Sequence, residues 1–129
     1  MVVHILLVED DPDVADVMCT MLREADFRCS IAHGADEAFS LLAKGDIQVI
    51  VTDVLLRGQV SGLDIAARGG ALGIGSVLVT GDGNTMERLD TMPHRWLRKP
   101  FRSHELIDAV RDAASVARGE SDQPPGAPR

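Results

Sequence analysis

Short apolar runs alternate with longer amphipathic segments along most of the 129-residue chain. Runs rich in Val, Ile and Leu predict five strands, at residues 5–8, 27–31, 47–52, 76–80 and 94–98. Apolar residues at helical spacing predict helices at residues 12–22, 35–43, 63–68 and 85–89 and from residue 103 onward. This alternation favours an α/β fold, with a doubly wound parallel sheet covered by helices on both faces.

Ordinary capping signals mark the ends of these helices. Asp11 can cap the first helix with Pro12 in its first turn, Gly45 marks the end of the second, and Ser103 can cap the last. The residues expected to face the core are Val14, Val17, Met18, Met21 and Leu22 in the first helix, Ala38, Phe39 and Leu42 in the second, and Leu106, Ile107, Val110, Ala114 and Ala117 in the last.

One domain is expected over residues 1–118, followed by a disordered tail at residues 119–129 that is rich in Pro, Gly and polar residues. Glycines between residues 69 and 75 predict a flexible passage into the fourth strand. Gly81, Gly83 and Pro93 leave room for only a short helix before the fifth strand. The initial Met and the loose tail favour a complete small protein over a piece of a hybrid kinase.

The composition favours a globular protein and argues against nucleic-acid or membrane binding. Hydrophobic residues make up 45%, which predicts a packed globule, and a net charge of −7 argues against nucleic-acid binding. Cys19 and Cys29 lack metal or redox spacing and are expected to be buried free thiols, and the four histidines show no metal-binding spacing. Since neither a leader nor a membrane-spanning apolar stretch is recognisable, we expect a cytoplasmic protein with no membrane contact.

Polar residues stand at the carboxyl ends of four of the predicted strands. Glu9 and Asp10 follow the first, Asp53 the third and Lys99 the fifth, while Thr80 ends the fourth. Ligands gather outside the carboxyl ends of parallel strands, so these side chains are expected to converge. Carboxylates suit Mg²⁺, a lysine neutralises phosphoryl oxygens, and a hydroxyl can donate to the same group. Each residue alone has a structural explanation as a cap or turn; their joint order predicts Mg²⁺-assisted phosphorylation of Asp53.

Five motifs then repeat the order of a known family. They are Ile5-Leu6-Leu7-Val8-Glu9-Asp10-Asp11, Val51-Thr52-Asp53, Ser61-Gly62-Leu63, Val79-Thr80-Gly81 and Lys99-Pro100-Phe101. Over roughly residues 3–118 the chain resembles a receiver domain of a two-component response regulator. The resemblance implies a flavodoxin-like sheet with strand order 2-1-3-4-5 and Asp53 as the phosphoacceptor.

The resemblance also implies the metal ligands. Asp10 would bind Mg²⁺ directly together with Asp53, Glu9 would act largely through bound water, and the main-chain carbonyl of Leu55 would complete the set. Asp11 is better explained as a helix cap than as a ligand.

The same resemblance implies a switch. Lys99, with a cis peptide bond before Pro100, would hold the phosphoryl group, and Thr80 would move toward it. An aromatic residue on the fifth strand then swings inward in this family, and Trp96 occupies that position. We leave open whether Trp96 switches or is an ordinary, partly buried core residue.

Three departures from the family pattern stand out. Arg57 occupies the place of the usual proline four residues after Asp53, the segment between Thr80 and Lys99 is short for a full helix, and Leu55 and Asp82 stand at positions that tune hydrolysis. A leucine beside the site would hinder an attacking water, so we expect a long-lived phosphorylated state. The short segment indicates that output or dimerisation uses another face.

The main hypothesis is therefore a receiver that catalyses only its own phosphorylation and dephosphorylation. Its partners would be a sensor histidine kinase or a histidine phosphotransfer protein, and a downstream protein target. The sequence leaves monomer and homodimer open. A pseudo-receiver acting as a constitutive binding module is the alternative. An aspartyl phosphatase is the third reading, disfavoured because Leu55 stands where such enzymes place a general acid.

Overall fold

The computed structural model describes residues 2–58, 60–81 and 95–117. Strands and helices alternate along them, as the hydrophobic pattern predicts. In chain order they are β1 (His4–Val8), α1 (Pro12–Glu24), β2 (Arg28–Ala32), α2 (Ala35–Ala43), β3 (Val49–Asp53), α3 (Gly62–Ala71), β4 (Gly75–Thr80), β5 (Arg95–Arg98) and α5 (Ser103–Ala117).

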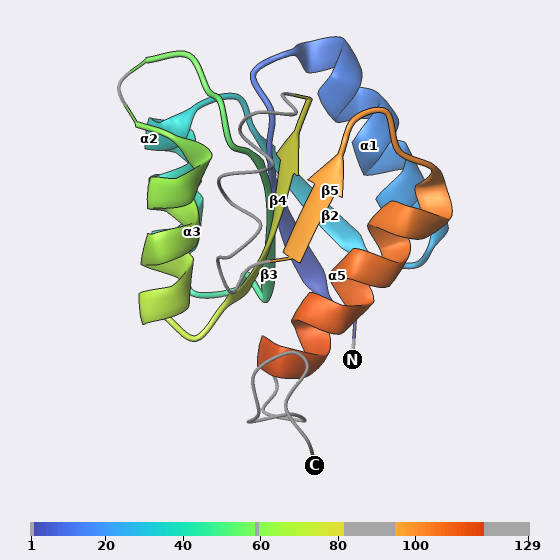
Figure 1. The fold of residues 1–129 in the computed structure, drawn as a ribbon. Helices are drawn as coiled ribbons and strands as arrows, with labels where there is room; N and C mark the ends of the chain where they lie inside the picture. The colour runs from blue at the N-terminus through green and yellow to red at the C-terminus, as the bar shows by residue number, and fades with distance from the viewer. Residues whose placement is uncertain (1, 59, 82–94, 118–129) are drawn as a thin grey trace.

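The five strands form one parallel sheet in the order β2-β1-β3-β4-β5, which confirms the flavodoxin-like, doubly wound prediction (Figure 1). Val8 of β1 pairs with Thr52 of β3, and Asp53 pairs with Val79 of β4. The carboxyl ends of these three strands therefore meet at one edge of the sheet.

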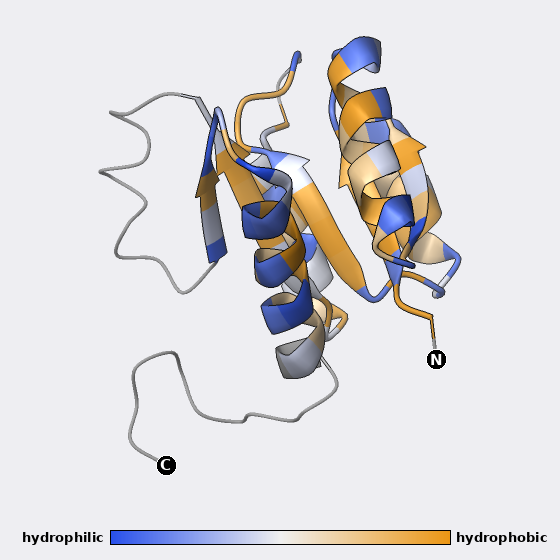
Figure 2. Ribbon diagram, turned by 90° about the vertical axis from the view of Figure 1, so that its right-hand side faces the viewer, coloured by the Kyte–Doolittle hydropathy of each residue, from blue (hydrophilic) through white to orange (hydrophobic). Residues whose placement is uncertain are grey.

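Helices cover both faces of the sheet. α1 and α5 lie on one face, and α2 and α3 lie on the other (Figure 1). Alternate residues of each strand serve the two layers: Ile5 and Leu7 pack with α1 and α5, whereas Leu6 and Val8 pack with α2 and α3. Figure 2 looks onto the face that α1 and α5 cover: the strands are largely apolar, and α5 is mostly hydrophilic on the side toward the viewer.

The cap and the buried face of α1 can be compared residue by residue with the sequence prediction. Asp11 Oδ1 accepts the N–H groups of Asp13 at 3.0 Å and Val14 at 3.4 Å, so Asp11 is the predicted N-cap. Val17 was predicted to face the core, and this is wrong, because its side chain is 56% exposed. The buried stripe instead follows the tighter spacing of Ala15, Met18, Cys19 and Leu22.

α5 begins one residue earlier than a Ser103 cap would require, so that prediction is wrong. Ser103 is the first helical residue, and Glu105 reaches back to accept the N–H of Arg102 at 2.8 Å. Glu105, the third helical residue, therefore satisfies the N–H of the residue that precedes the helix. Leu106 and Val110 are fully buried, as predicted.

The predicted flexible passage after residue 68 is also wrong in part. α3 continues to Ala71, and Gly69 and Gly70 lie inside it. A Cβ on Gly69 would overlap Cδ1 of Ile50, so the glycine lets α3 approach β3 closely.

Other predictions concern smaller features. Cys19 and Cys29 are buried free thiols, as expected. The predicted helix at residues 85–89, Asp82 and the predicted tail lie outside the described residues. Among the described helices, none combines the length and apolar character needed to cross a membrane.

Candidate functional site

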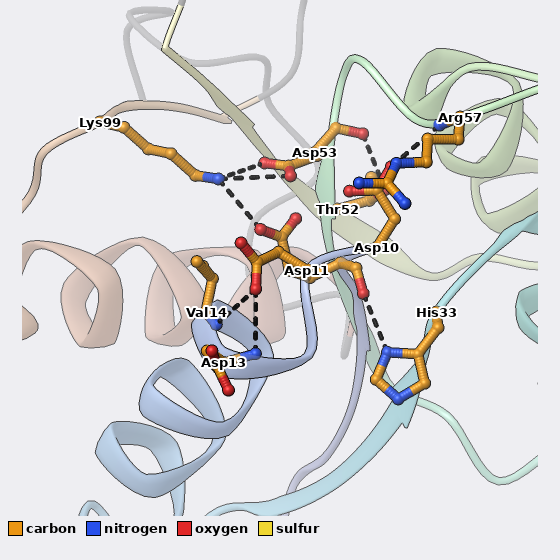
Figure 3. Close-up of polar contacts among 10 residues, drawn as sticks. Asp10, Asp11, Asp13, Val14, His33, Thr52, Asp53, Arg57 and Lys99 are labelled. Atoms are coloured by element: carbon orange, nitrogen blue, oxygen red, sulfur yellow. Dashed lines mark hydrogen bonds and ion pairs between the residues drawn. The ribbon is translucent and has the colours of Figure 1, made fainter.

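The carboxyl ends of three strands bring Glu9, Asp53 and Lys99 together, and Figure 3 shows Lys99 reaching toward Asp53. Glu9 follows β1 directly, Asp53 is the last residue of β3, and Lys99 follows β5. The sheet register sets this convergence, because parallel strands end on the same side.

Lys99 joins the two carboxylates. Its Nζ lies 3.0 Å from Asp53 Oδ1 and 3.3 Å from Glu9 Oε1. The main-chain N–H of Lys99 donates to the carbonyl of Thr80 at 2.9 Å, and the Lys99–Pro100 bond is cis, as the resemblance implied. The ammonium group thus lies between the predicted phosphoacceptor and the most buried acid of the site.

Asp10 adds a third carboxylate. One oxygen from each of Glu9, Asp10 and Asp53 lies within 4.8 Å of the others. Burial, followed by hydrogen bonding and charge from Asp53, raises the pKa of Glu9 to about 8, although Lys99 opposes this shift. Burial alone would lower the pKa of Lys99, but Asp53 and Glu9 outweigh it and the pKa lies above its usual value. Ionising all three carboxylates would leave Lys99 with too little positive charge to balance them.

The donor set fits a hydrated divalent cation. Glu9 Oε2 is buried and has no hydrogen-bond partner among the described residues. An unpartnered carboxylate oxygen beside two further carboxylates offers the hard oxygen ligands that Mg²⁺ prefers. Leu55 lies two residues beyond Asp53 with its side chain 65% exposed, and its carbonyl as a ligand stays a prediction.

The two predicted switch residues lie on neighbouring strands. Thr80 ends β4 and is 3% exposed. Trp96 lies on β5, pairs with Leu78 in the sheet, and packs partly buried beside the cluster of Val54, Ala66 and Leu78. This position is compatible with both readings of Trp96, so its movement stays a prediction.

Arg57 is a site residue whose contact the sequence did not predict. Its main-chain N–H donates to Asp10 Oδ2 at 3.0 Å, and its Nε lies 3.8 Å from the same oxygen (Figure 3). The signal was present in the sequence, because only a residue other than proline has an N–H to offer at this position.

Gly62 is a second residue whose structural role the sequence did not predict. A Cβ at this position would overlap the carbonyl oxygen of Asp53, and the Gly62 N–H donates to the carbonyl of Val54 at 2.9 Å. The glycine after Ser61 therefore allows the start of α3 to lie directly against the backbone of the predicted phosphoacceptor.

Two neighbouring side chains hold the loop after β1. Asp11 points to the first turn of α1, which agrees with a cap and not with a ligand (Figure 3). His33 Nδ1 lies 3.2 Å from the carbonyl oxygen of Glu9, a contact that steadies this loop from β2.

Comparison with known proteins matches this geometry to a family. The family model described as "Response regulator receiver domain" matches residues 5–111, most of the chain. The chain belongs to this family. Receiver domains are typically non-enzymatic signalling modules of two-component systems, and they use Mg²⁺ at an acidic pocket.

Curated relatives of this receiver domain are longer. The uncharacterized transcriptional regulatory protein YkoG of Bacillus subtilis is 29% identical over 85% of this chain and 50% of its own length. Response regulator SaeR of Staphylococcus aureus is 28% identical over 81% of this chain and 47% of its own length. The chain thus spans about half the length of these relatives.

Solved receiver structures share the fold at low identity. A response regulator receiver protein from Sinorhizobium medicae matches 90% of this chain and 97% of its own, with a TM-score of 0.80 at 22% identity. A CheY-like receiver domain protein from Methanospirillum hungatei matches 94% of this chain and all of its own, with a TM-score of 0.79 at 20% identity. At this identity the likeness concerns the fold alone.

Proposed function

We propose that this receiver domain accepts a phosphoryl group on Asp53 in a Mg²⁺-dependent reaction and thereby switches its binding to a downstream protein. The observation that carries the proposal is the Lys99 ammonium, held 3.0 Å from Asp53 beside the three gathered carboxylates of Glu9, Asp10 and Asp53. A cytoplasmic location, with a histidine kinase or histidine phosphotransfer protein as donor, follows from the family and belongs to the proposal.

In the transfer step one carboxylate oxygen of Asp53 attacks the donor phosphorus. A P–O bond to Asp53 forms while the bond from phosphorus to the leaving group, an imidazole nitrogen or an acyl oxygen, breaks and the leaving group keeps the electron pair. Lys99 balances charge on the equatorial oxygens, and Thr80 donates its hydroxyl to one of them. Glu9, Asp10, Asp53 and the Leu55 carbonyl would hold Mg²⁺, which neutralises charge and orients the phosphoryl group.

The phosphorylated state would then bias a two-state equilibrium through Thr80 and Trp96. Leu55, with its side chain exposed beside the site, would slow the approach of water and lengthen the lifetime of that state. Comparing dephosphorylation in the parent and in Leu55→Asn tests this point, and equal rates would remove it.

Intact-mass measurement after incubation with acetyl phosphate and Mg²⁺ tests the acceptor. The parent should gain one phosphoryl mass, Asp53→Asn should gain none, and the exposed control Asp16→Asn should behave as the parent. Equal labelling of the parent and Asp53→Asn would place the acceptor elsewhere. If neither acetyl phosphate nor a histidine kinase labels a folded parent, the constitutive binding module becomes the better explanation. A steady turnover of phosphomonoesters would instead point to a phosphatase.

A further inference from the structure

Asp10 is engaged twice by one residue of the β3–α3 loop. Oδ2 of Asp10 accepts the main-chain N–H of Arg57 at 3.0 Å, and the guanidinium Nε of the same residue lies 3.8 Å from it. Asp10 is also one of the three acids whose oxygens gather within 4.8 Å. Two positively polarised groups therefore compete with any cation for this carboxylate.

We propose that Arg57 acts as an internal competitor for Mg²⁺: it pairs with Asp10 in the metal-free domain and must release its side chain when the cation binds. The inference rests on the proposed function, because it concerns the same metal site. It assigns to Arg57 a role in setting how much cation the domain needs before it can be phosphorylated.

The competition has two parts that differ in strength. The main-chain N–H gives a short hydrogen bond to a charged acceptor, and it persists with any residue other than proline. The Arg57 side chain is 88% exposed and its Nε lies 3.8 Å from the partner oxygen, so water and salt screen this contact strongly. The side chain is the part that a cation can displace at little cost, and its effect should depend on salt.

The position of Arg57 gives this competition a direction. A cation bound by Asp10 and Asp53 would lie near the guanidinium, and the two positive charges would repel each other. Lys99 is held 3.0 Å from Asp53, and Figure 3 shows it on the other side of Asp53 from Arg57. A cation of the protein thus lies on each side of the acidic cluster, and the Arg57 side chain is the more exposed of the two, 88% against 31% for Lys99.

Calorimetric titration of Mg²⁺ into the unphosphorylated full chain tests the inference without measuring phosphorylation. Arg57→Ala removes the guanidinium and keeps the N–H, so it should bind Mg²⁺ about two- to fivefold more tightly than the parent at low salt. Arg57→Lys keeps the charge and should stay closer to the parent than Arg57→Ala. Arg57→Pro removes both groups and should bind at least as tightly as Arg57→Ala.

Two controls separate the effect of the Arg57–Asp10 contact from the effect of removing any positive charge. Arg98→Ala removes an exposed positive charge at the end of β5, and Arg111→Ala removes one from the outer side of α5. Both should change the affinity by less than about twofold. The ratio of the Mg²⁺ affinity of Arg57→Ala to that of the parent should fall toward one as salt is raised, because salt screens the contact between Arg57 and Asp10.

The outcomes are distinct. A folded parent that binds no Mg²⁺ would overturn the proposed function itself. A parent that binds Mg²⁺ with the same affinity as Arg57→Ala at low salt would overturn only the role of Arg57. Weaker binding by Arg57→Ala would also overturn it, since Arg57 would then help Asp10 to hold the cation. If Arg57→Pro fails to fold by circular dichroism, the alanine and lysine variants still decide.

Discussion

The two edges of the same sheet treat buried polar groups in opposite ways. At the amino edge, the ring of His4 lies between Ser30 Oγ at 2.7 Å and the Asp46 carbonyl at 3.1 Å, and its main-chain N–H donates to Gln48 at 2.7 Å. Both ring nitrogens have a partner. At the carboxyl edge, three carboxylates crowd together and Glu9 Oε2 has no hydrogen-bond partner among the described residues.

The difference indicates that the polar groups at the amino edge stabilise the fold, whereas those at the carboxyl edge serve a binding site. A satisfied polar cluster fixes the geometry of a strand end without storing unfavourable energy. Three crowded carboxylates are costly to ionise together in the free protein, as the raised pKa of Glu9 indicates, and a bound cation would remove that cost. Substitutions at the amino edge are therefore expected to change the free energy of unfolding. Substitutions at the carboxyl edge are expected to change Mg²⁺ binding and phosphorylation.

Lys99→Ala should give the largest effect, because it removes the protein's own cation from the predicted phosphoacceptor. Loss of one preorganised charge partner of a transferring group costs about 100-fold or more in rate. Labelling by acetyl phosphate, followed by intact mass over time, measures it. Lys44→Ala at the exposed end of α2 is the matched control and should label as the parent does. A similar rate in Lys99→Ala would remove Lys99 from the reaction.

Gly62→Ala tests how closely α3 lies against Asp53. The new Cβ would overlap the Asp53 carbonyl, so either the loop or the helix must shift, at a cost of about 2–3 kcal/mol in the free energy of unfolding. Gly70→Ala in the same helix meets no atom within 4 Å and should stabilise by about 0.5–1 kcal/mol. Denaturant titration of both variants makes the comparison. Two equally stable alanine variants would contradict the close packing at Gly62.

His4→Ala addresses the amino edge alone. It removes both ring contacts and leaves Ser30 short of a partner, which should lower the free energy of unfolding by about 1–3 kcal/mol. Calorimetric Mg²⁺ affinity should not change, because His4 lies at the opposite edge of the sheet. His104→Ala, exposed at the start of α5, should change stability by less than about 0.5 kcal/mol. A large loss of Mg²⁺ affinity in folded His4→Ala would mean that the two edges are coupled.

The sequence predicted the fold and the members of the acidic cluster because both follow from periodicity and strand ends. Glu9, Asp53 and Lys99 stand at the carboxyl ends of predicted strands. These ends lie on one side of a parallel sheet, so the three side chains are expected close together. The strand order itself came from the family resemblance. Asp11 as a cap was predictable because its partners are local in sequence.

What the sequence did not predict depends on long-range contacts. Arg57 touches a residue 47 positions away, and Gly62 is required by the backbone of Asp53. The His4 contacts with Ser30 and Asp46 span three segments and leave no local pattern. Val17 was misassigned because hydrophobicity alone cannot tell a core position from an exposed valine when two helical stripes overlap.

The last expected effect is a pH dependence of the stability that comes from Glu9. Its pKa is about 8 in the folded domain against an ordinary value of 4.5, because it is buried beside Asp53. Between these values the folded protein keeps a proton that the unfolded chain releases. The contribution of Glu9 to the free energy of unfolding is therefore full below the unfolded value, falls as pH rises through this window, and levels off above it.

Glu9→Gln isolates this contribution, since other acids titrate in the parent and in the variant alike. Without metal, the parent should lose about 1–3 kcal/mol more than Glu9→Gln between pH ~5 and ~9 in denaturant titrations. Saturating Mg²⁺ favours the charged carboxylate and should flatten the parent's curve while leaving the variant's nearly unchanged. Parallel curves for the two proteins without metal would mean that Glu9 is ionised throughout. Water would then reach Glu9 well enough to keep its pKa near the ordinary value, and burial would not distinguish the carboxyl edge from the amino edge.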